Sequence, residues 1–282
     1  MDKEKNWDLI IKPKPNIFHL GLKEVFAYKD LIWLFVKRDV VAQYKQTILG
    51  PLWLVIQPVL TTIFFTIIFG NFAKFDTGEI PFPVFTLSGL TIWNFFATSL
   101  NKTSSVFVSN ASIFGKVYFP RLIIPLSIVL TNLLKFAIQF VLFLAIYFYF
   151  LATKNFQPNL YLLLFPILII MIAMLGLASG MIISSLTIRY KDLVHLITFG
   201  VQLLMFTSSV FFPVTGITNI FYRKVMLANP MTGIIETFRY GFTSEGYFRW
   251  NIFGYDVLVI ISLMLLAIIL FNIVEKDFVD NI

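Results

Sequence analysis

Few side chains in this sequence could catalyse a covalent reaction or bind a metal ion. Cysteine is absent, which excludes a thiolate nucleophile, a disulfide and a thiolate metal site. The two histidines, His19 and His195, lie too far apart in sequence to form a local zinc motif of the H-E-x-x-H type. Gly115-Lys116 is the nearest approach to a phosphate-binding loop, but Asn110 stands where that motif needs its first glycine. We therefore expect no metal site, no bound cofactor and no ATP hydrolysis in this chain.

Lys135 is the one charged residue inside a long apolar segment. It shares a helical stripe with Ser127, Thr131 and Gln139 at four-residue spacing, which predicts that this face of the helix avoids lipid. A lysine on such a face either meets an anionic head group in a pore or interface, or is satisfied by polar neighbours on an adjoining helix. The sequence leaves both interpretations open.

Glu236 and Arg239 form a second candidate site. Their spacing of three residues on a predicted short helix allows them to form an ion pair. The alternative is that Arg239 is free to bind a phosphate at an outer mouth, since guanidinium groups bind phosphates well. The spacing favours the structural pair.

The 15 acidic residues all lie outside the long apolar segments, and Asp256 and Glu275 flank the last of these, 257–274. Transporters driven by proton or sodium gradients need titratable groups or carboxylates at membrane depth. We therefore expect that any uphill transport by this chain is powered by another polypeptide.

The elements that position these residues are predicted to cross a membrane. Of the 282 residues, 58% are hydrophobic and 13% are charged, and the mean hydropathy is +0.84. Soluble domains carry about 25% charged residues, so a soluble enzyme is excluded. Six apolar segments of roughly 18 to 30 residues are each long enough to span a bilayer. The predicted spans are 51–70, 82–100, 122–151, 160–188, 196–213 and 257–274.

An even number of spans places both termini on one side of the membrane. That side holds fifteen Lys and Arg residues and the other side six, which predicts that both termini are cytoplasmic. We expect an all-α polytopic protein with a retained cytoplasmic tail over 1–17 and a transmembrane domain over 51–282.

Residues 18–50 are predicted to form an amphipathic helix that lies in the membrane interface. Val36, Val40, Tyr44 and Ile48 form an apolar stripe, while charged residues occupy the other faces. The alternative is an amphipathic helix packed on its own protein; the basic charge beside the membrane favours the interfacial position.

Two short helices, 217–227 and 231–242, are predicted between the fifth and sixth spans. Asn229-Pro230 separates them as a helix N-cap followed by a proline at the first helical position. Each helix would be about 17 to 18 Å long, which suits a re-entrant hairpin. The alternative is an external loop that lies on the surface.

The 33 Phe, 11 Tyr and five Trp residues exceed what two interfacial belts need, so some are expected to face helix partners or a conduit. Our candidates for channel-lining residues are Phe64, Phe65, Phe206 and Phe212, together with Lys135. In the fourth predicted span, Gly176, Gly180 and Ser184 form a small-residue ladder that predicts close packing within the chain.

Five strings, in order along the chain, resemble the ABC-2 type permeases that export lipid-linked polysaccharides or polyol-phosphate polymers. They are VKRDVVAQYKQTILGPLWLVIQPVLT (36–61), GLTIWNFFATSL (89–100), VSNASIFGKVYFPRLIIPL (108–126), RYKD (189–192) and NPMTGIIETFR (229–239). The resemblance runs from about residue 25 to the C-terminus.

The resemblance implies the membrane subunit of an O-antigen (lipopolysaccharide) type exporter in the bacterial plasma membrane, which moves an undecaprenyl-pyrophosphate-linked polysaccharide. It implies a homodimer in the bilayer that works with two separate ATPase subunits, which bind ATP and Mg²⁺. No nucleic acid and no covalent chemistry is implied. Alternatives are export of teichoic acid or another polyol-phosphate polymer, an ABC-2 lipid or drug exporter, and a membrane glycosyltransferase.

The resemblance also implies roles for particular residues. The coupling helix that docks on the ATPase would be 109–121, with Phe114, Lys116, Tyr118 and Arg121 in contact and auxiliary contacts from Arg189 and Asp192. The amphipathic helix would form a cytoplasmic gate, with Trp33, Arg38 and Tyr44 near the lipid head group. The helices within 217–242, with Asn229, Pro230, Glu236 and Arg239, would form the external gate. Lys135 departs from the family pattern, which often has an acidic residue there.

Overall fold

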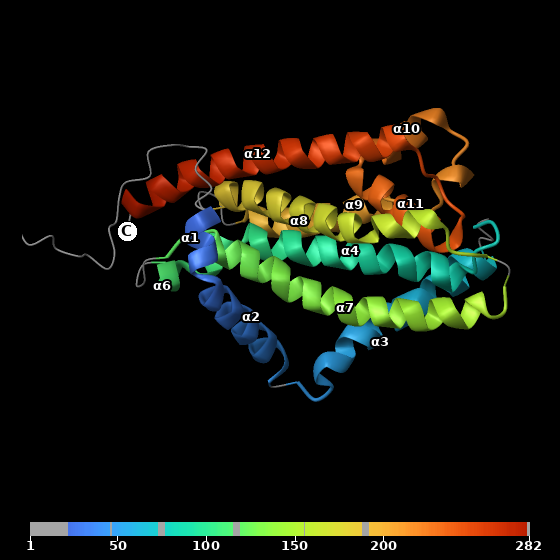
Figure 1. Cartoon of the computed structure of the whole chain (residues 1–282), viewed down its shortest axis with the longest axis horizontal. Helices are drawn as coiled ribbons and strands as arrows, with labels where there is room; N and C mark the ends of the chain where they lie inside the picture. The colour runs from blue at the N-terminus through green and yellow to red at the C-terminus, as the bar shows by residue number, and fades with distance from the viewer. Residues whose placement is uncertain are drawn as a thin grey trace, which may run out of the picture.

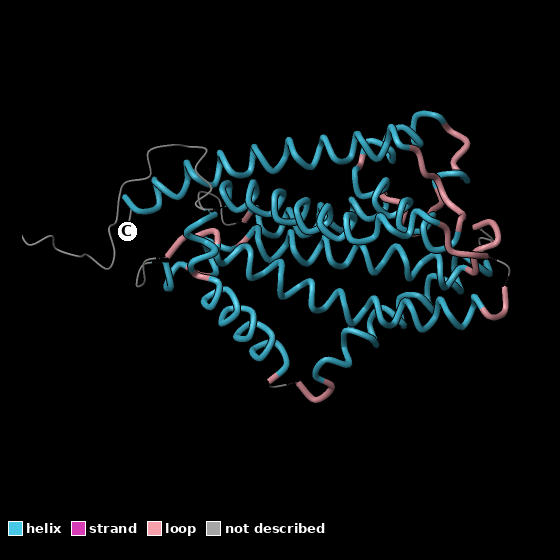
Figure 2. The backbone as a smooth tube through the Cα atoms, viewed as in Figure 1, coloured by secondary structure: helices cyan, strands magenta, loops and turns pink. Residues whose placement is uncertain are grey.

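The computed structural model describes residues 22–45, 47–72, 77–114, 119–154, 156–187 and 192–280. Within these ranges every regular element is helical, and the long helices run side by side as an elongated bundle (Figures 1 and 2). One end of the bundle carries α1, α6 and the C-terminus, and we call it the α6 end. The opposite end carries α10 and α11, and we call it the α11 end.

Four helical segments within the described ranges are long and apolar enough to cross a membrane, which makes this a multi-pass membrane protein. They are Gly50–Gly70, Ile123–Leu151, Leu160–Thr187 and Trp250–Val274. They contain, respectively, α3 (Trp53–Phe65), α7 (Ile123–Leu151), α8 (Phe165–Thr187) and most of α12 (Trp250–Asp280). A 3-10 turn (Gly50–Leu52) leads into α3 and a π-helical turn (Thr66–Phe72) follows it, and a 3-10 turn (Leu160–Leu164) leads into α8.

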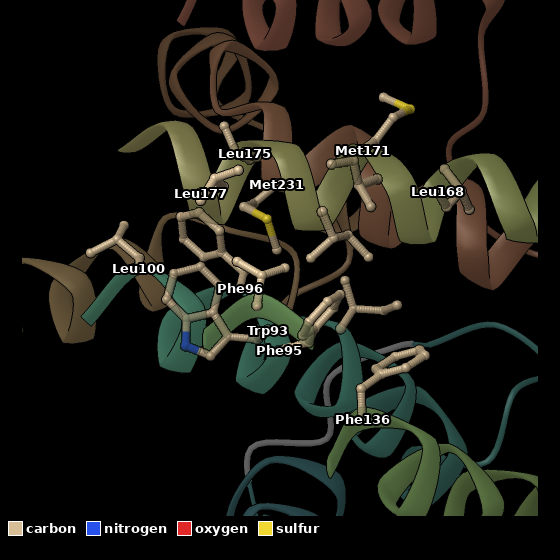
Figure 3. Close-up of a cluster of buried hydrophobic side chains, with 14 of the residues drawn as sticks. Trp93, Phe95, Phe96, Leu100, Phe136, Leu168, Met171, Leu175, Leu177 and Met231 are labelled. Atoms are coloured by element: carbon tan, nitrogen blue, oxygen red, sulfur yellow. The ribbon is translucent and has the colours of Figure 1, made fainter. Parts of the chain in front are cut away.

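The central helix, α4 (Phe82–Ser104), is less apolar than these four because most of it faces protein and not lipid. It packs against α7 and α8 (Figure 1). Trp93, Phe95 and Phe96 of α4 lie in a buried cluster with residues of α7 and α8, such as Phe136 and Met171 (Figure 3).

The small-residue ladder on α8 faces α4, as the sequence predicts. A Cβ atom at Gly176 would lie 2.9 Å from Ser99 Cβ, and one at Gly180 would lie 2.5 Å from Thr103 Cβ. Only glycine permits this approach of the two helices, so the ladder serves packing within the chain.

Two predicted spans differ from the structure in extent. The fifth contains α9 (Leu193–Phe206), which is only 14 residues long, so the helix ends seven residues before the predicted end of the span at residue 213. The sixth begins with α12 at Trp250, seven residues before the predicted start at Val257. Asp256 therefore lies inside a membrane-spanning segment, and the expectation that all acidic residues lie outside the spans is wrong.

The remaining elements lie at the two ends of the bundle. At the α6 end, α1 (Leu22–Ala27) and α2 (Lys29–Tyr44) precede α3, and α5 (Val106–Ser109) and α6 (Ala111–Phe114) follow α4. At the α11 end, a 3-10 turn (Val214–Gly216), α10 (Ile220–Ala228) and α11 (Pro230–Thr243) connect α9 to α12.

Helix α2 packs on α7 through one face. Phe35 and Val36 are buried, whereas Trp33 and Leu34 are 65% and 61% exposed, and Ile48, at the end of the predicted stripe, is fully exposed. The helix thus packs one face on its own protein, as the alternative interpretation holds, and leaves a second apolar face uncovered within the chain.

Candidate functional site

Helix α11 is held in the bundle by a buried arginine. The helix begins where the sequence predicts, with the Asn229 side chain accepting a hydrogen bond from Met231 N and Pro230 at the first helical position. It buries most of its residues against α4, α8 and α12. In the third turn of α11, Arg239 is 1% exposed.

The Arg239 guanidinium finds partners on three elements. Its Nη1 donates to Glu236 Oε1 at 2.9 Å and to Ser209 Oγ at 2.9 Å, and its Nη2 donates to the Ser209 carbonyl oxygen at 2.6 Å. Its Nε donates to Ser88 Oγ on α4 at 3.0 Å, and the guanidinium carbon lies 3.5 Å from the centre of the Phe85 ring. We call these residues the Arg239 network; it ties α11 to α4 and to the segment after α9.

Glu236 completes the Arg239 network. Its Oε1 also accepts a hydrogen bond from Ser209 Oγ, and its Oε2 accepts one from Tyr247 N at 2.7 Å. The ion pair that the three-residue spacing favours is therefore formed, and both partners are buried. The alternative, a free Arg239 that binds phosphate, is not the arrangement in this structure.

The Arg239 network explains why α9 is short. Arg239 Nη2 also reaches the Val210 carbonyl oxygen at 3.2 Å, and a carbonyl continued into helix would instead bind an amide of the next turn. Gly89 makes room for this arrangement, because a Cβ atom there would lie 2.8 Å from Arg239 Nη2 and 2.9 Å from Val210 Cα. Beyond the end of the helix, the Ser209 and Val210 carbonyl oxygens therefore bind the guanidinium and not helical amides.

A cavity of about 290 Å³ opens beside the Arg239 network at the α11 end. Its lining includes Thr77, Thr215 and Glu245 as well as Glu236 and Arg239 themselves. Because the Glu236–Arg239 ion pair is neutral as a unit, Glu245 is the lining residue that adds a charge outside this pair.

The predicted channel-lining aromatic residues of α3 and of the α9 region converge at the same end. Phe65 stacks on Phe211 with ring centres 3.8 Å apart, and Phe69 contacts Phe212 at 5.5 Å. Phe64 and Phe206 are 60% and 48% exposed, so they point away from the chain's own core. The structure brings Phe65 and Phe212 into one cluster through Phe69 and Phe211, two aromatic residues outside our list of channel-lining candidates.

The polar stripe on α7 is buried, as predicted. Ser127, Thr131, Lys135 and Gln139 are each at most 9% exposed. Gln139 Oε1 accepts a hydrogen bond from Asn94 Nδ2 of α4 at 3.3 Å. The stripe therefore faces protein and not lipid.

Lys135 meets a second lysine that the sequence alone does not single out. The ammonium group of Lys102, on α4, is near enough to repel it, while Asp39 on α2 attracts it. Asp39 also pairs with its neighbour Arg38 at 2.8 Å. The site where α2, α4 and α7 meet thus carries more positive than negative charge.

The other residues predicted at the α6 end differ in how far their side chains are exposed, and some lie outside the described residues. On α2, Trp33 and Arg38 are exposed and Tyr44 is half-buried, and burial raises the pKa of the Tyr44 hydroxyl. Asp192 is exposed just before α9, and Arg121 is buried before α7. Phe114 ends α6, whereas Lys116, Tyr118 and Arg189 lie outside the described residues.

Comparison with known proteins identifies the family to which this chain belongs. Residues 30–243 match the model of the ABC-2 type transporter family. This chain belongs to the ABC-2 type transporter family. It is a transport permease and not an enzyme, and the family implies partner ATPase subunits.

Several characterised members of the family are similar to this chain at low identity. The O-antigen export system permease protein RfbA of Myxococcus xanthus is 27% identical over 77% of this chain and 82% of its own length. The polysialic acid transport protein KpsM of Escherichia coli is 25% identical over 74% and 81%. The capsule polysaccharide export inner-membrane protein CtrC of Neisseria meningitidis is 21% identical over 88% and 92%.

Proposed function

We propose that this ABC-2 permease exports an undecaprenyl-pyrophosphate-linked polysaccharide of the O-antigen type across the bacterial plasma membrane. The observation that carries the proposal is the match along most of the chain to permeases named for O-antigen and capsular polysaccharide export. A membrane glycosyltransferase would need a catalytic carboxylate or histidine pair. In the described residues of the α11 end, the buried carboxylate of Glu236 is instead engaged by Arg239, and that of Asp256 has no hydrogen-bond partner, so neither belongs to such a pair.

In the proposed topology the chain crosses the membrane six times with both termini in the cytoplasm. Helix α4 has 23 residues and runs beside α7 and α8, so its length of about 34 Å suffices for a fifth crossing. The remaining crossing is formed by α9, which is about 21 Å long, together with residues 207–213. The α6 end then faces the cytoplasm and the α11 end faces outward.

The energy comes from two ATPase subunits, which bind ATP and Mg²⁺. They dock on the segment 109–121 through Phe114, Lys116, Tyr118 and Arg121, with auxiliary contacts at Arg189 and Asp192. In support of this assignment, the described part of the segment, including α6, lies at the α6 end, where the C-terminus also lies (Figure 1).

The lipid-linked substrate enters beside α2. Trp33, Arg38 and Tyr44 lie near the head group, and the Lys102–Lys135 pair attracts its phosphates because two neighbouring ammonium groups are stabilised by a shared anion. The net positive charge where α2, α4 and α7 meet supports this assignment.

The glycan passes between two copies of the chain, along apolar surfaces that one copy leaves uncovered. Leu60 and Phe64 on α3, and Phe199 and Phe206 on α9, are all at least 48% exposed. Aromatic rings such as these, with Phe65 and Phe212 nearby, allow sugars to slide without tight binding. Asn229, Pro230, Glu236 and Arg239 hold α11 as the external gate.

Affinity purification of the tagged chain from its native host tests the proposal. We expect an ATPase at equal stoichiometry, and we expect lipid-linked glycan to accumulate inside cells that lack the chain. Absence of a co-purifying ATPase would refute the proposed assembly. Accumulation of a polyol-phosphate polymer instead of a glycan would assign the alternative substrate.

A further inference from the structure

The α11 end contains a buried carboxylate that the proposed function does not use. Asp256 is the seventh residue of α12, inside a membrane-spanning segment, and its side chain is 0% exposed. Neither of its carboxylate oxygens has a hydrogen-bond partner among the described residues. A buried charge in this position is costly unless something neutralises it.

The Asp256 carboxylate lies against the first turns of α11. It fills the space beside Gly233, where a Cβ atom would come within 2.8 Å of Asp256 Cγ. The neighbouring Tyr255 hydroxyl donates to the Ala228 carbonyl oxygen at 3.0 Å, just before α11 begins. This contact region therefore joins α12 to the N-terminal half of α11.

Two more buried polar atoms without a partner in the described chain lie on the same part of α11. They are Thr232 Oγ1 and Asn229 Nδ2. Thr232 precedes Gly233, and Asn229 lies one helical turn before it. The side-chain Oδ1 of Asn229 accepts the hydrogen bond from Met231 N, which fixes the orientation of the side-chain amide so that Nδ2 is the group left to donate. We call Asp256, Gly233, Thr232 and Asn229 the Asp256 site.

No cation of the described residues neutralises Asp256. The ionisable residues near this end of the elements packed around it are Glu236, Arg239 and Tyr240 on α11, Tyr222, Arg223 and Lys224 on α10, Arg249 just before α12, and Tyr255 on α12; α8 contributes none. Arg239 is engaged by Glu236, and both Arg223 and Arg249 stack on the Tyr247 ring at 4.8 and 5.0 Å. Lys224 is exposed.

The chemistry of the Asp256 site favours a proton over a metal cation. Hard cations require several oxygen ligands, whereas this site offers one carboxylate and one hydroxyl. The Asn229 Nδ2 group is a hydrogen-bond donor, which cannot act as a ligand of a cation but suits a carboxyl group that accepts hydrogen bonds. A protonated Asp256 would be neutral, with one donor and remaining acceptor capacity.

We propose that Asp256 is a proton-binding site at the α11 end, and that its proton is bound when the N-terminal half of α11 is seated on α12. Loss of the proton leaves a charge that must reach water, so it loosens this half of the helix. Under the proposed topology the proton comes from outside. The proposal concerns helix docking and holds whatever substrate the permease exports.

Hydrogen exchange on the complete transporter in lipid nanodiscs tests the proposal. Protection factors, which are corrected for the intrinsic pH dependence of exchange, are measured for amides of 230–237 and of α8 between about pH 5 and about pH 9. We expect protection of 230–237 to fall by up to about tenfold per pH unit over part of this range, while α8 stays constant. Constant protection of 230–237 would overturn the proposal.

Variants and infrared spectra identify the responsible group. Asp256→Asn and Asp256→Ala should each abolish the pH dependence, whereas Glu245→Gln, a control at a half-buried carboxyl near the same end, should keep it. A pH response that persists in the Asp256 variant that folds would overturn the assignment. If neither variant folds, the wild-type spectrum decides: at low pH we expect the carbonyl stretch of one protonated buried carboxyl group, and its absence would refute the proposal.

Discussion

The two polar sites on α11 differ in how completely their groups are satisfied. In the C-terminal half of the helix, Arg239 and Glu236 are surrounded by donors and acceptors from α4, from the segment after α9 and from Tyr247. Against the N-terminal half, Asp256 lies buried with no hydrogen-bond partner in the described chain. One helix is therefore fixed by polar contacts at one end and held mainly by apolar packing at the other.

This difference shows what buried charge does in each setting. A fully hydrogen-bonded ion pair fixes geometry, since removal of either partner leaves an uncompensated charge in a low-dielectric interior. A buried carboxylate without partners is destabilising while it is charged, so its protonation responds to the environment. We expect α11 to open, when it opens, from its N-terminal half.

The largest effect is expected from loss of the guanidinium. Arg239→Met should destabilise the protein by about 3–5 kcal/mol, because Glu236 remains buried without its partner. Thermal unfolding in detergent measures the loss, and Arg249→Met, at an exposed position, serves as the control. A loss no greater than that of the control would show that the Arg239 network does not fix the helix.

Gly89→Ala perturbs the same network without removing a charge. The added methyl group would press on Arg239 Nη2 and on the Val210 backbone, so we expect a loss of about 1–3 kcal/mol. Gly200→Ala on α9 is the matched control, because nothing lies within 4 Å of its Cβ position and alanine favours the helix. Equal melting temperatures for the two variants would contradict the prediction.

Gly233→Ala tests how closely Asp256 approaches α11. The new methyl group overlaps the carboxylate, so we expect a loss of about 1–3 kcal/mol. Combination with Asp256→Ala should restore most of this loss, since the overlapping group is gone. A double-mutant cycle measures the coupling, and additive effects would show that the two residues do not touch.

The smallest effect is expected from Asp256→Ala alone. Because the carboxylate makes no hydrogen bond within the described chain, its removal should change stability by no more than about 1 kcal/mol at low pH. Thermal unfolding of Asp256→Ala and of Arg239→Met under the same conditions compares the stability that the two halves of α11 contribute. A loss as large as that of the arginine variant would remove the distinction between the two sites.

Much of the bundle follows from the sequence because apolar runs end at polar or turn residues. The starts of α4, α7 and the segment that contains α8, and the Asn229-Pro230 start of α11, fall within one residue of the predictions. The Glu236–Arg239 ion pair is also predictable from the sequence, because a spacing of three residues on a helix is a local signal.

The features that the sequence did not predict all depend on contacts between distant segments. The end of α9 at Phe206 reflects the demand of Arg239 for the Ser209 and Val210 carbonyl oxygens, which no local pattern reveals. Its charge makes Asp256 a natural boundary of the last span in the sequence, but the space beside Gly233, 23 residues earlier, allows it to lie inside that span. The sequence does not predict that Lys102 lies near Lys135, because the two lysines are on different helices.

The Arg239 network also determines how α11 can move. With Arg239 as a fixed pivot, Pro230 lies nine residues away, at the tip of a lever arm of about 14 Å. A tilt of about ten degrees would then swing that tip by about 2 Å, enough to wet a crevice between α11 and α12, whereas side chains near the pivot would hardly shift. A small rotation here is thus geometrically amplified at one tip only.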